Sequence, residues 1–292
     1  MRLLTFEDHG RLALGVRLGE QVVPVAALSG FPDDVIALLG AGGDTLARLE
    51  AAAKAAPAST HRALASLTLG MPVPKPGKMI CIGLNYALHA KEGGNPIPDY
   101  PAVFLRVQSS LVGPNQPMLR PHGVSEKLDY EAELAVIIGT RARHVTEANA
   151  LAHVAGYSLF NDGSVRDFQR KSTQWTMGKN FDATGAFGPE IVTADEVPPG
   201  AAPLRITTRV DGQTVQDSTT ADMIFSVARC IAILSEVMTL EPGDVIATGT
   251  PSGVGYARTP PLFLAPGMVV EIEVEGIGVL RNSVADDPAL AA

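Results

Sequence analysis

Short apolar segments separated by glycines and turn residues fill most of the chain after Met79, and they constrain the fold more than any other feature. Each segment has the length of one β-strand, and successive segments follow at close intervals. This series predicts a β-rich body with antiparallel or mixed pairing. The segments are MICIGL, AVFLRV, AELAVIIG, AGYSLFND, LRITTRV, DVIATGT, MVVEIEVEG and GVLRNSV.

Helical patterns are few, and they suggest a small unit at the N-terminus. MIFSVARCIAILSEVM, residues 223–238, has apolar residues at helical spacing. The first seventy residues combine strand patterns (RLLTF, LALGVRL, QVVPV) with two helix patterns, DDVIALLG and DTLARLEAAAKAA, the second with Asp44 as its candidate cap. LGMPVPKPGK follows as a linker or extended crossing strand. We expect an α+β, mainly β protein with an N-terminal α/β domain over residues 1–72 and a second domain over residues 73–292.

Composition excludes several classes of partner. The chain has 292 residues, 46% hydrophobic and 18% charged, which is typical of a globular protein. A net charge of −8, with scattered Lys and Arg, disfavours nucleic acid and anionic membrane surfaces. Cys81 and Cys230 lack CxxC spacing and predict buried thiols in a reducing compartment. Since we find neither a signal-peptide pattern nor an apolar run of ~18 residues, we expect a cytoplasmic protein.

The segment LDYEAELAVIIG contains the most informative pattern. Alternation along a strand places Glu131 and Glu133 on one face, with Ala135 and Ile137 beyond them. Two carboxylates on a face that turns apolar raise each other's pKa unless a cation lies between them, and Mg²⁺ or Mn²⁺ prefers such oxygen ligands. A solvated strand face would show the same pattern, and it is the commoner origin of Glu-x-Glu taken alone.

Further polar residues follow the next strands. Asp162 ends the apolar segment YSLFND, where an acidic residue can also form a turn or cap a helix. Arg166 and Gln169 come soon after it, and Lys179 lies near Trp175, the only tryptophan. Lys179 taken alone would be an ordinary surface lysine.

His89 and Glu92 in GLNYALHAKE are three residues apart, so a helix would place them on one face. Such a pair is usually a surface contact worth a few tenths of a kcal/mol. With the carboxylates and Lys179 nearby, it becomes a candidate base and its orienting partner. The other five histidines lack comparable neighbours in the sequence.

The ordered motifs GLNYALHAKE, SSLVGP, LDYEAELAVIIG, WTMGKNFD and LEPGDVIATGTPSGVG resemble the fumarylacetoacetate hydrolase family, over residues 73–285. The similarity is greatest to its bacterial acylpyruvate-hydrolase-like branch with a small N-terminal domain. The resemblance implies a mixed β-roll or sandwich with the site at one mouth, and a homodimer.

The resemblance also implies roles for nine residues. Glu131, Glu133 and Asp162 match the ligands of Mg²⁺ or Mn²⁺, His89 and Glu92 match a catalytic dyad on a lid helix, and Lys179 matches a lysine that contacts substrate oxygen; Arg166, Gln169 and Thr250 match substrate-binding positions. Gly163, next to Asp162, departs from the family pattern, and we expect it to loosen the backbone there.

Together these residues suit hydrolysis of an acylpyruvate or other 2,4-diketo acid, with the metal ion as Lewis acid and His89 as general base. The products would be pyruvate, or a related 2-oxo acid, and a carboxylic acid. Decarboxylation of oxaloacetate, and isomerase or hydratase chemistry on a 2-oxo acid, remain open at the same site. A non-catalytic metabolite-binding or scaffolding dimer is a further alternative. We expect no nucleotide cofactor.

Overall fold

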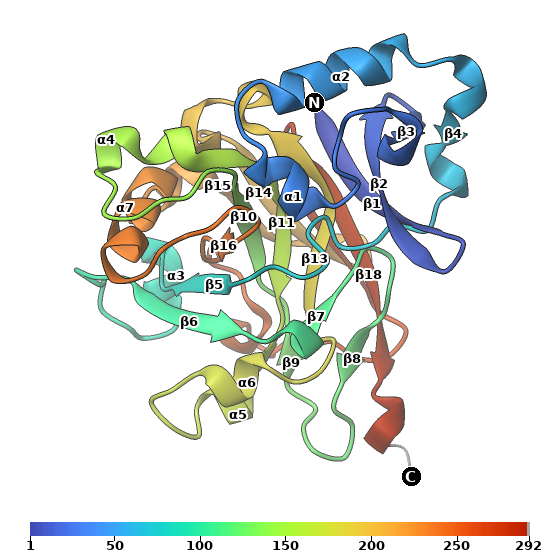
Figure 1. The fold of residues 1–292 in the computed structure, drawn as a ribbon. Helices are drawn as coiled ribbons and strands as arrows, with labels where there is room; N and C mark the ends of the chain where they lie inside the picture. The colour runs from blue at the N-terminus through green and yellow to red at the C-terminus, as the bar shows by residue number, and fades with distance from the viewer. Residues whose placement is uncertain (291–292) are drawn as a thin grey trace.

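The computed structural model describes residues 1–290, and a mixed sheet of 11 strands runs through it (Figure 1). The strand order is β4-β3-β2-β1-β13-β11-β10-β16-β5-β6, and β7 pairs with β13 outside this path. The strands predicted in the N-terminal segment therefore continue the sheet of the later chain, through the pairing of β1 with β13. The boundary between residues 72 and 73 stays a prediction. The strands are β1 (Arg2–Asp8), β2 (Arg11–Leu18), β3 (Gln21–Pro24), β4 (Arg62–Ala63), β5 (Met79–Gly83), β6 (Ala102–Arg106), β7 (Leu111–Val112), β10 (Ala132–Ile138), β11 (Val154–Asp162), β13 (Gly185–Thr193) and β16 (Val245–Ala247).

A second sheet of 5 strands packs against the first, and a two-stranded ribbon lies beside them. The five-stranded sheet has the order β15-β14-β17-β18-β8, and the ribbon pairs β9 with β12. This layering confirms the predicted mainly β, α+β class. These strands are β8 (Met118–Arg120), β9 (Leu128–Asp129), β12 (Ser164–Val165), β14 (Arg205–Val210), β15 (Gln213–Thr219), β17 (Val269–Val274) and β18 (Gly278–Asp286).

Strand β10 is covered on both faces. Leu134 and Val136 belong to the core shared with the five-stranded sheet, whereas Ala135 and Ile137 belong to the core shared with the N-terminal helices. All seven residues of β10 are buried. The interpretation of Glu-x-Glu as a solvated strand face is therefore wrong, because Glu133 lies on a strand without a solvent-exposed face.

The helices are short, and two of them differ from the sequence prediction at their N-termini. The predicted helix at residues 223–238 begins only at Val227, because Ser226 caps it by accepting a hydrogen bond from Arg229 N. Asp44 makes no capping hydrogen bond and instead accepts one from Arg48. The helices are α1 (Val35–Gly40), α2 (Thr45–Ala55), α3 (Ala87–Glu92), α4 (Glu147–Ala150), α5 (Arg166–Gln169), α6 (Thr176–Lys179) and α7 (Val227–Val237).

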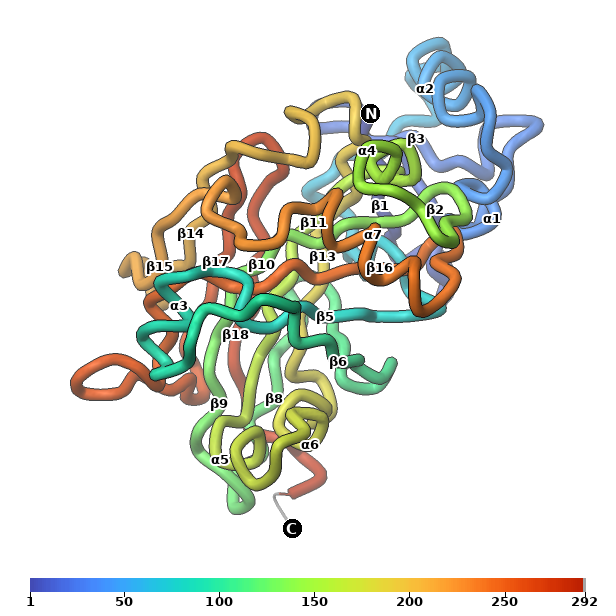
Figure 2. Tube along the Cα trace, turned by 90° about the vertical axis from the view of Figure 1, so that its left-hand side faces the viewer, coloured from blue at the N-terminus to red at the C-terminus, as the bar shows by residue number. Residues whose placement is uncertain are grey.

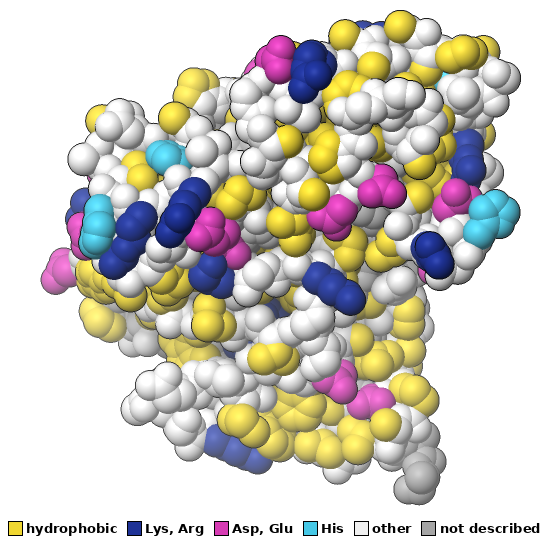
Figure 3. Space-filling model, in the orientation of Figure 1, with side chains coloured by type: hydrophobic (Ala, Val, Ile, Leu, Met, Phe, Trp, Pro, Cys, Tyr) yellow, Lys and Arg dark blue, Asp and Glu magenta, His cyan; other side chains and the backbone are white. Residues whose placement is uncertain are grey.

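The N-terminal unit and the pair α5–α6 lie at opposite ends of the molecule. Figure 2 shows α5 and α6 side by side at the lower end, below β5 and β6, while α2 lies at the top. On the face shown in Figure 3, basic and acidic side chains of the described residues are interspersed, without a continuous basic stripe. None of the helices within residues 1–290 is long and apolar enough to cross a membrane. Cys81 and Cys230 are buried and free, as predicted.

Candidate functional site

The antiparallel register of β10 and β11 brings the three predicted carboxylate ligands together. Ala132 pairs with Asn161, so Glu131 faces Asp162 as the next pair along, and Asp162 N donates to Glu131 O at 2.9 Å. Residues directly opposite each other project to the same side of a sheet. Glu133 projects from that side two residues further on. Oxygen atoms of Glu131, Glu133 and Asp162 lie within 4.8 Å of one another, and all three residues are buried.

Three buried cations contact two of these carboxylates. Lys179 Nζ lies 2.6 Å from both Glu131 Oε2 and Asp162 Oδ2. Arg166 Nη2 lies 2.7 Å from Glu131 Oε1, and Arg106 Nη1 lies 2.6 Å from Asp162 Oδ1. Each of the two carboxylates thus has a protein cation in contact with both of its oxygen atoms.

Glu133 lacks such a cation. The one hydrogen bond to its carboxylate among residues 1–290 comes from Gly249 N to Oε2, at 2.9 Å. Burial raises the pKa of Glu133 well above its usual range, and Asp162 and Glu131 raise it further. Burial acts in the same direction on Glu131, but Arg166 and Lys179 outweigh it and hold the pKa of Glu131 well below its usual range.

The donor set fits a hard divalent cation. Three carboxylates offer only oxygen ligands, which Mg²⁺ and Mn²⁺ prefer. When all four of its buried carboxyl groups are ionised, as metal binding requires of Glu133, the cluster carries one negative charge in excess of its three buried cations. The carboxylates are Asp129, Glu131, Glu133 and Asp162, and the cations are Arg106, Arg166 and Lys179. A divalent ion would reverse the sign of this excess and favour an anionic ligand.

His89 and Glu92 lie on α3 and are paired there. His89 Nδ1 lies 2.8 Å from Glu92 Oε1, and Gly253 N donates to Glu92 Oε2 at 2.9 Å. Because a carboxylate only accepts hydrogen bonds, Nδ1 carries the proton and Nε2 is the ring nitrogen that can act as a base. Glu92 thus fixes the tautomer of His89 and also ties α3 to the loop at Gly253.

One cavity of about 260 Å³ connects these groups. Eight of the nine residues singled out from the sequence line it, and Glu92 lies behind His89 instead. Gln169 Oε1 accepts from Arg166 Nη1 at 3.0 Å, and Thr250 Oγ1 accepts from Gln216 Nε2 at 2.9 Å. The Thr250 hydroxyl can donate in turn to a bound ligand.

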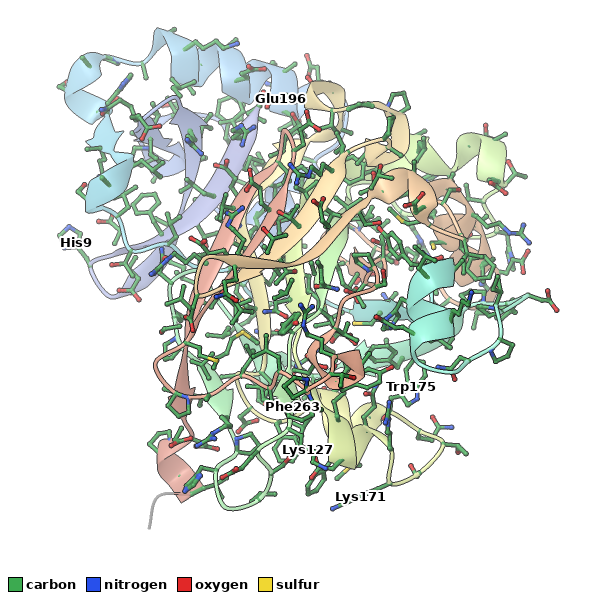
Figure 4. The ribbon with its side chains drawn as sticks, turned by 180° about the vertical axis from the view of Figure 1, so that it is seen from behind. His9, Lys127, Lys171, Trp175, Glu196 and Phe263 are labelled. Atoms are coloured by element: carbon green, nitrogen blue, oxygen red, sulfur yellow. The ribbon has the colours of Figure 1, made fainter. Side chains whose placement is uncertain are left out.

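Two glycines at the site are required by close packing. A Cβ at Gly83 would lie 2.1 Å from the Trp175 ring, whose position between α3 and the α5–α6 pair is visible in Figure 4. A Cβ at Gly163 would lie 1.9 Å from Thr184 O. The expectation that Gly163 loosens the backbone is therefore wrong, because the chain packs directly against it.

Sequence reasoning missed two residues that hold the site together. Asp129 is fully buried and accepts from Gly255 N, Tyr256 N and Arg166 Nε at 2.8 to 3.0 Å. It precedes Glu131 by two residues, so the alternation that revealed the Glu pair also pointed to it. Arg106 lies 56 residues before Asp162 in the chain, and local pattern could not predict their contact.

Known proteins resemble this chain in sequence and in structure. A family model described as fumarylacetoacetate (FAA) hydrolase C-terminal matches residues 78–285. The human mitochondrial oxaloacetate tautomerase FAHD2A is 44% identical over 222 residues, 75% of this chain and 69% of that protein. A fumarylacetoacetate hydrolase from Exiguobacterium antarcticum superposes with a TM-score of 0.84 at 37% identity, covering 98% of this chain and 100% of that one. Maleylpyruvate hydrolase from Sphingobium sp. SYK-6, crystallised with manganese(II) and pyruvate, gives 0.81 at 32% identity, covering 98% and 99%.

Proposed function

This chain belongs to the fumarylacetoacetate hydrolase family, and from that premise we propose that it is a metal-dependent hydrolase of acylpyruvate-type 2,4-diketo acids. It would cleave a C–C bond to give pyruvate, or a related 2-oxo acid, and a carboxylic acid. The observation that carries the proposal is the buried three-carboxylate cluster, one cation short, in the same cavity as the His89 ring.

In this proposal Glu131, Glu133 and Asp162 hold Mg²⁺ or Mn²⁺. The ion supplies Lewis-acid polarisation of the 2-oxo group of the substrate. Lys179 Nζ, between Glu131 and Asp162, donates to a substrate oxygen, and the Thr250 hydroxyl donates to the substrate carboxylate. Arg166 keeps Glu131 in place through their 2.7 Å ion pair and orients Gln169 through a hydrogen bond.

His89 acts as the general base. Glu92 accepts the Nδ1 proton, so Nε2 removes a proton from the water that attacks the acyl carbonyl. Glu92 also stabilises the imidazolium that results, because its carboxylate lies 2.8 Å from the ring. The proton can return from Nε2 to the carbon that leaves, which completes the hydrolysis.

The direct test is a substrate screen with a variant pair. Wild-type protein with Mn²⁺ should release pyruvate from an acylpyruvate, and chelation should abolish release. His89→Ala should lower kcat by about 10²–10⁴ and leave metal-dependent oxalate binding intact. The control is His122→Ala, since the His122 side chain is 53% exposed. Unchanged activity in His89→Ala would refute the role of His89.

A second candidate reaction is supported by the relatives. The 44% identical human protein is named an oxaloacetate tautomerase, and a structural neighbour from Mycobacterium marinum, 32% identical, is named a 2-hydroxyhepta-2,4-diene-1,7-dioate isomerase. Proton transfer between carbon and oxygen would use the same carboxylate cluster and the same His89. An enzyme that equilibrates enol and keto oxaloacetate but releases no pyruvate from acylpyruvates would be a tautomerase.

The setting of the reaction is part of the same proposal. The small-molecule substrate is an anionic 2-oxo or 2,4-diketo acid, in agreement with the charge of the loaded site. A homodimer and a cytoplasmic location, both expected from the sequence and the resemblance, remain predictions.

A further inference from the structure

Arg170 is a cation of the cavity that has no acidic partner. It follows α5 directly, lines the same cavity as the carboxylate cluster and is exposed. Within residues 1–290 its guanidinium forms no ion pair and no side-chain hydrogen bond, whereas Arg166 and Lys179 are both bound to carboxylates. Of these three cavity-lining cations, Arg170 is therefore the one free to bind an anion of a ligand.

The guanidinium of Arg170 is held in position by stacking. Its central carbon lies 4.3 Å from the centre of the Tyr256 ring, and that of Arg166 lies 4.5 Å from the same ring. The Tyr256 backbone is fixed because its N–H donates to the buried carboxylate of Asp129. Stacking occupies one face of a guanidinium and leaves its N–H groups, which lie in the plane of the group, available for a carboxylate.

The neighbouring Lys171 also makes a cation–π contact, and it serves as a comparison for Arg170. Its Nζ lies 3.3 Å from the centre of the Phe168 ring, but Lys171 is not among the residues that line the cavity. Figure 4 shows it on the segment after α5, at the lower edge of the molecule in that view. Stacking alone therefore does not distinguish Arg170, whereas its position on the cavity wall does.

We propose that Arg170 is a specificity-determining residue that binds a second carboxylate of the substrate. The metal-ligand carboxylates are at most 4% exposed whereas Arg170 is exposed, so we infer that the carboxylates lie at the inner end of the cavity and Arg170 lies toward its mouth. A 2-oxo acid bound at the inner end would present its far end to Arg170. This inference rests on the proposed function and narrows its substrate class to 2-oxo acids that carry a distal carboxylate.

The test uses two ligands that lack a 4-oxo group and so cannot undergo the proposed hydrolysis. 2-Oxoadipate and 2-oxohexanoate differ only in that a terminal carboxylate replaces a methyl group. Calorimetry with Mg²⁺ should show that wild-type protein binds 2-oxoadipate about tenfold or more tightly, as expected for a charge-assisted hydrogen bond. Arg170→Met should abolish the preference, Arg170→Lys should keep part of it, and the control Lys171→Met should retain it in full.

The outcomes separate this inference from the proposed function. Equal binding of the two ligands by wild-type protein, or an undiminished preference in Arg170→Met, overturns the role of Arg170 and leaves the metal site standing. Binding of neither ligand in the presence of Mg²⁺ overturns the proposed function, and the role of Arg170 with it.

Discussion

Glu133 and Glu190 are both 2% exposed and lie on strands of the same sheet, yet their surroundings differ. Glu190 Oε1 contacts two cations, Arg2 Nη1 at 2.6 Å and Arg17 Nη1 at 2.9 Å. Within the described residues Glu133 receives only the backbone N–H of Gly249. A buried carboxylate is costly unless it is paired. Glu190 therefore has a structural role, in which it links β1 and β2 to β13. Glu133 has no protein cation among residues 1–290, and it marks the place where an external cation can bind.

The largest expected effect comes from neutralising Glu133. Glu133→Gln should remove metal-dependent activity and weaken Mn²⁺ binding by more than 100-fold, since residues that merely support a metal ligand cost about 10–100-fold when lost. The free energy of unfolding of the metal-free protein should stay equal or rise, because a neutral amide replaces a buried carboxyl group whose raised pKa shows that its ionisation is unfavourable there. Calorimetric metal titration and denaturant unfolding in chelator measure the two effects. A large loss of metal-free stability would mean that Glu133 is structural.

Glu190→Gln should show the opposite behaviour. Removing the charge leaves Arg2 and Arg17 facing a neutral amide, which should lower the free energy of unfolding by about 3 kcal/mol. Metal affinity should remain that of the wild type, since Glu190 lies outside the cavity. Denaturant unfolding and metal titration of the same variant check both statements. A joint loss of stability and metal affinity would remove the distinction between the two acids.

Lys179→Met sharpens the comparison within the site. Lys179 Nζ contacts Glu131 Oε2 and Asp162 Oδ2, so it competes with a divalent ion for two of the three carboxylates that would hold the ion. Without the amine, Mn²⁺ affinity should rise by about tenfold, or 1.4 kcal/mol, while turnover falls because a donor to substrate oxygen is lost. The shift of Tm with added Mn²⁺ reports the affinity. A weaker shift than in wild type would show that Lys179 assists metal binding.

The smallest effect is expected at an exposed pair. Asp217 is 48% exposed and lies 2.7 Å from Arg205 Nη2, so Asp217→Asn should cost less than about 1 kcal/mol of unfolding free energy. The hydrogen bond from Arg205 lowers the pKa of Asp217. The contribution of the pair is therefore present at neutral pH and is lost as the pH falls below the usual range of an aspartate. Denaturant unfolding of wild type and Asp217→Asn at neutral and at acidic pH measures this contribution. A loss of unfolding free energy as large as that of Glu190→Gln would show that exposed and buried ion pairs are equivalent in this protein.

Sequence pattern predicted those features that depend on residues close together in the chain, such as the two faces of a strand or of a helix. Alternation along β10 correctly assigned its residues to two faces, and the spacing of His89 and Glu92 predicted their contact on α3. The same alternation, two residues earlier, contained Asp129, which was overlooked.

Contacts between residues far apart in the chain could not be predicted from the sequence. The cations that distinguish Glu131 from Glu133 come from α5 and α6, and no local pattern fixes which carboxylate each of them contacts. The close packing at Gly163 could not be predicted for the same reason, since Thr184, whose carbonyl oxygen packs against it, lies 21 residues further along the chain. The pairing of Glu190 with Arg2 and Arg17 likewise depends on β13 lying beside β1.

The central claim is that the buried cluster of Glu131, Glu133 and Asp162 is a divalent-metal site that takes a chelating 2-oxo acid. Calorimetric titration of metal-stripped protein with oxalate, first without and then with Mg²⁺, tests it most directly, because oxalate resembles the planar enolate of pyruvate. We predict binding only when Mg²⁺ is present. Absence of binding in both titrations, or equal binding in both, would contradict the claim, and in the first case a metabolite-binding or scaffolding role would become the leading explanation.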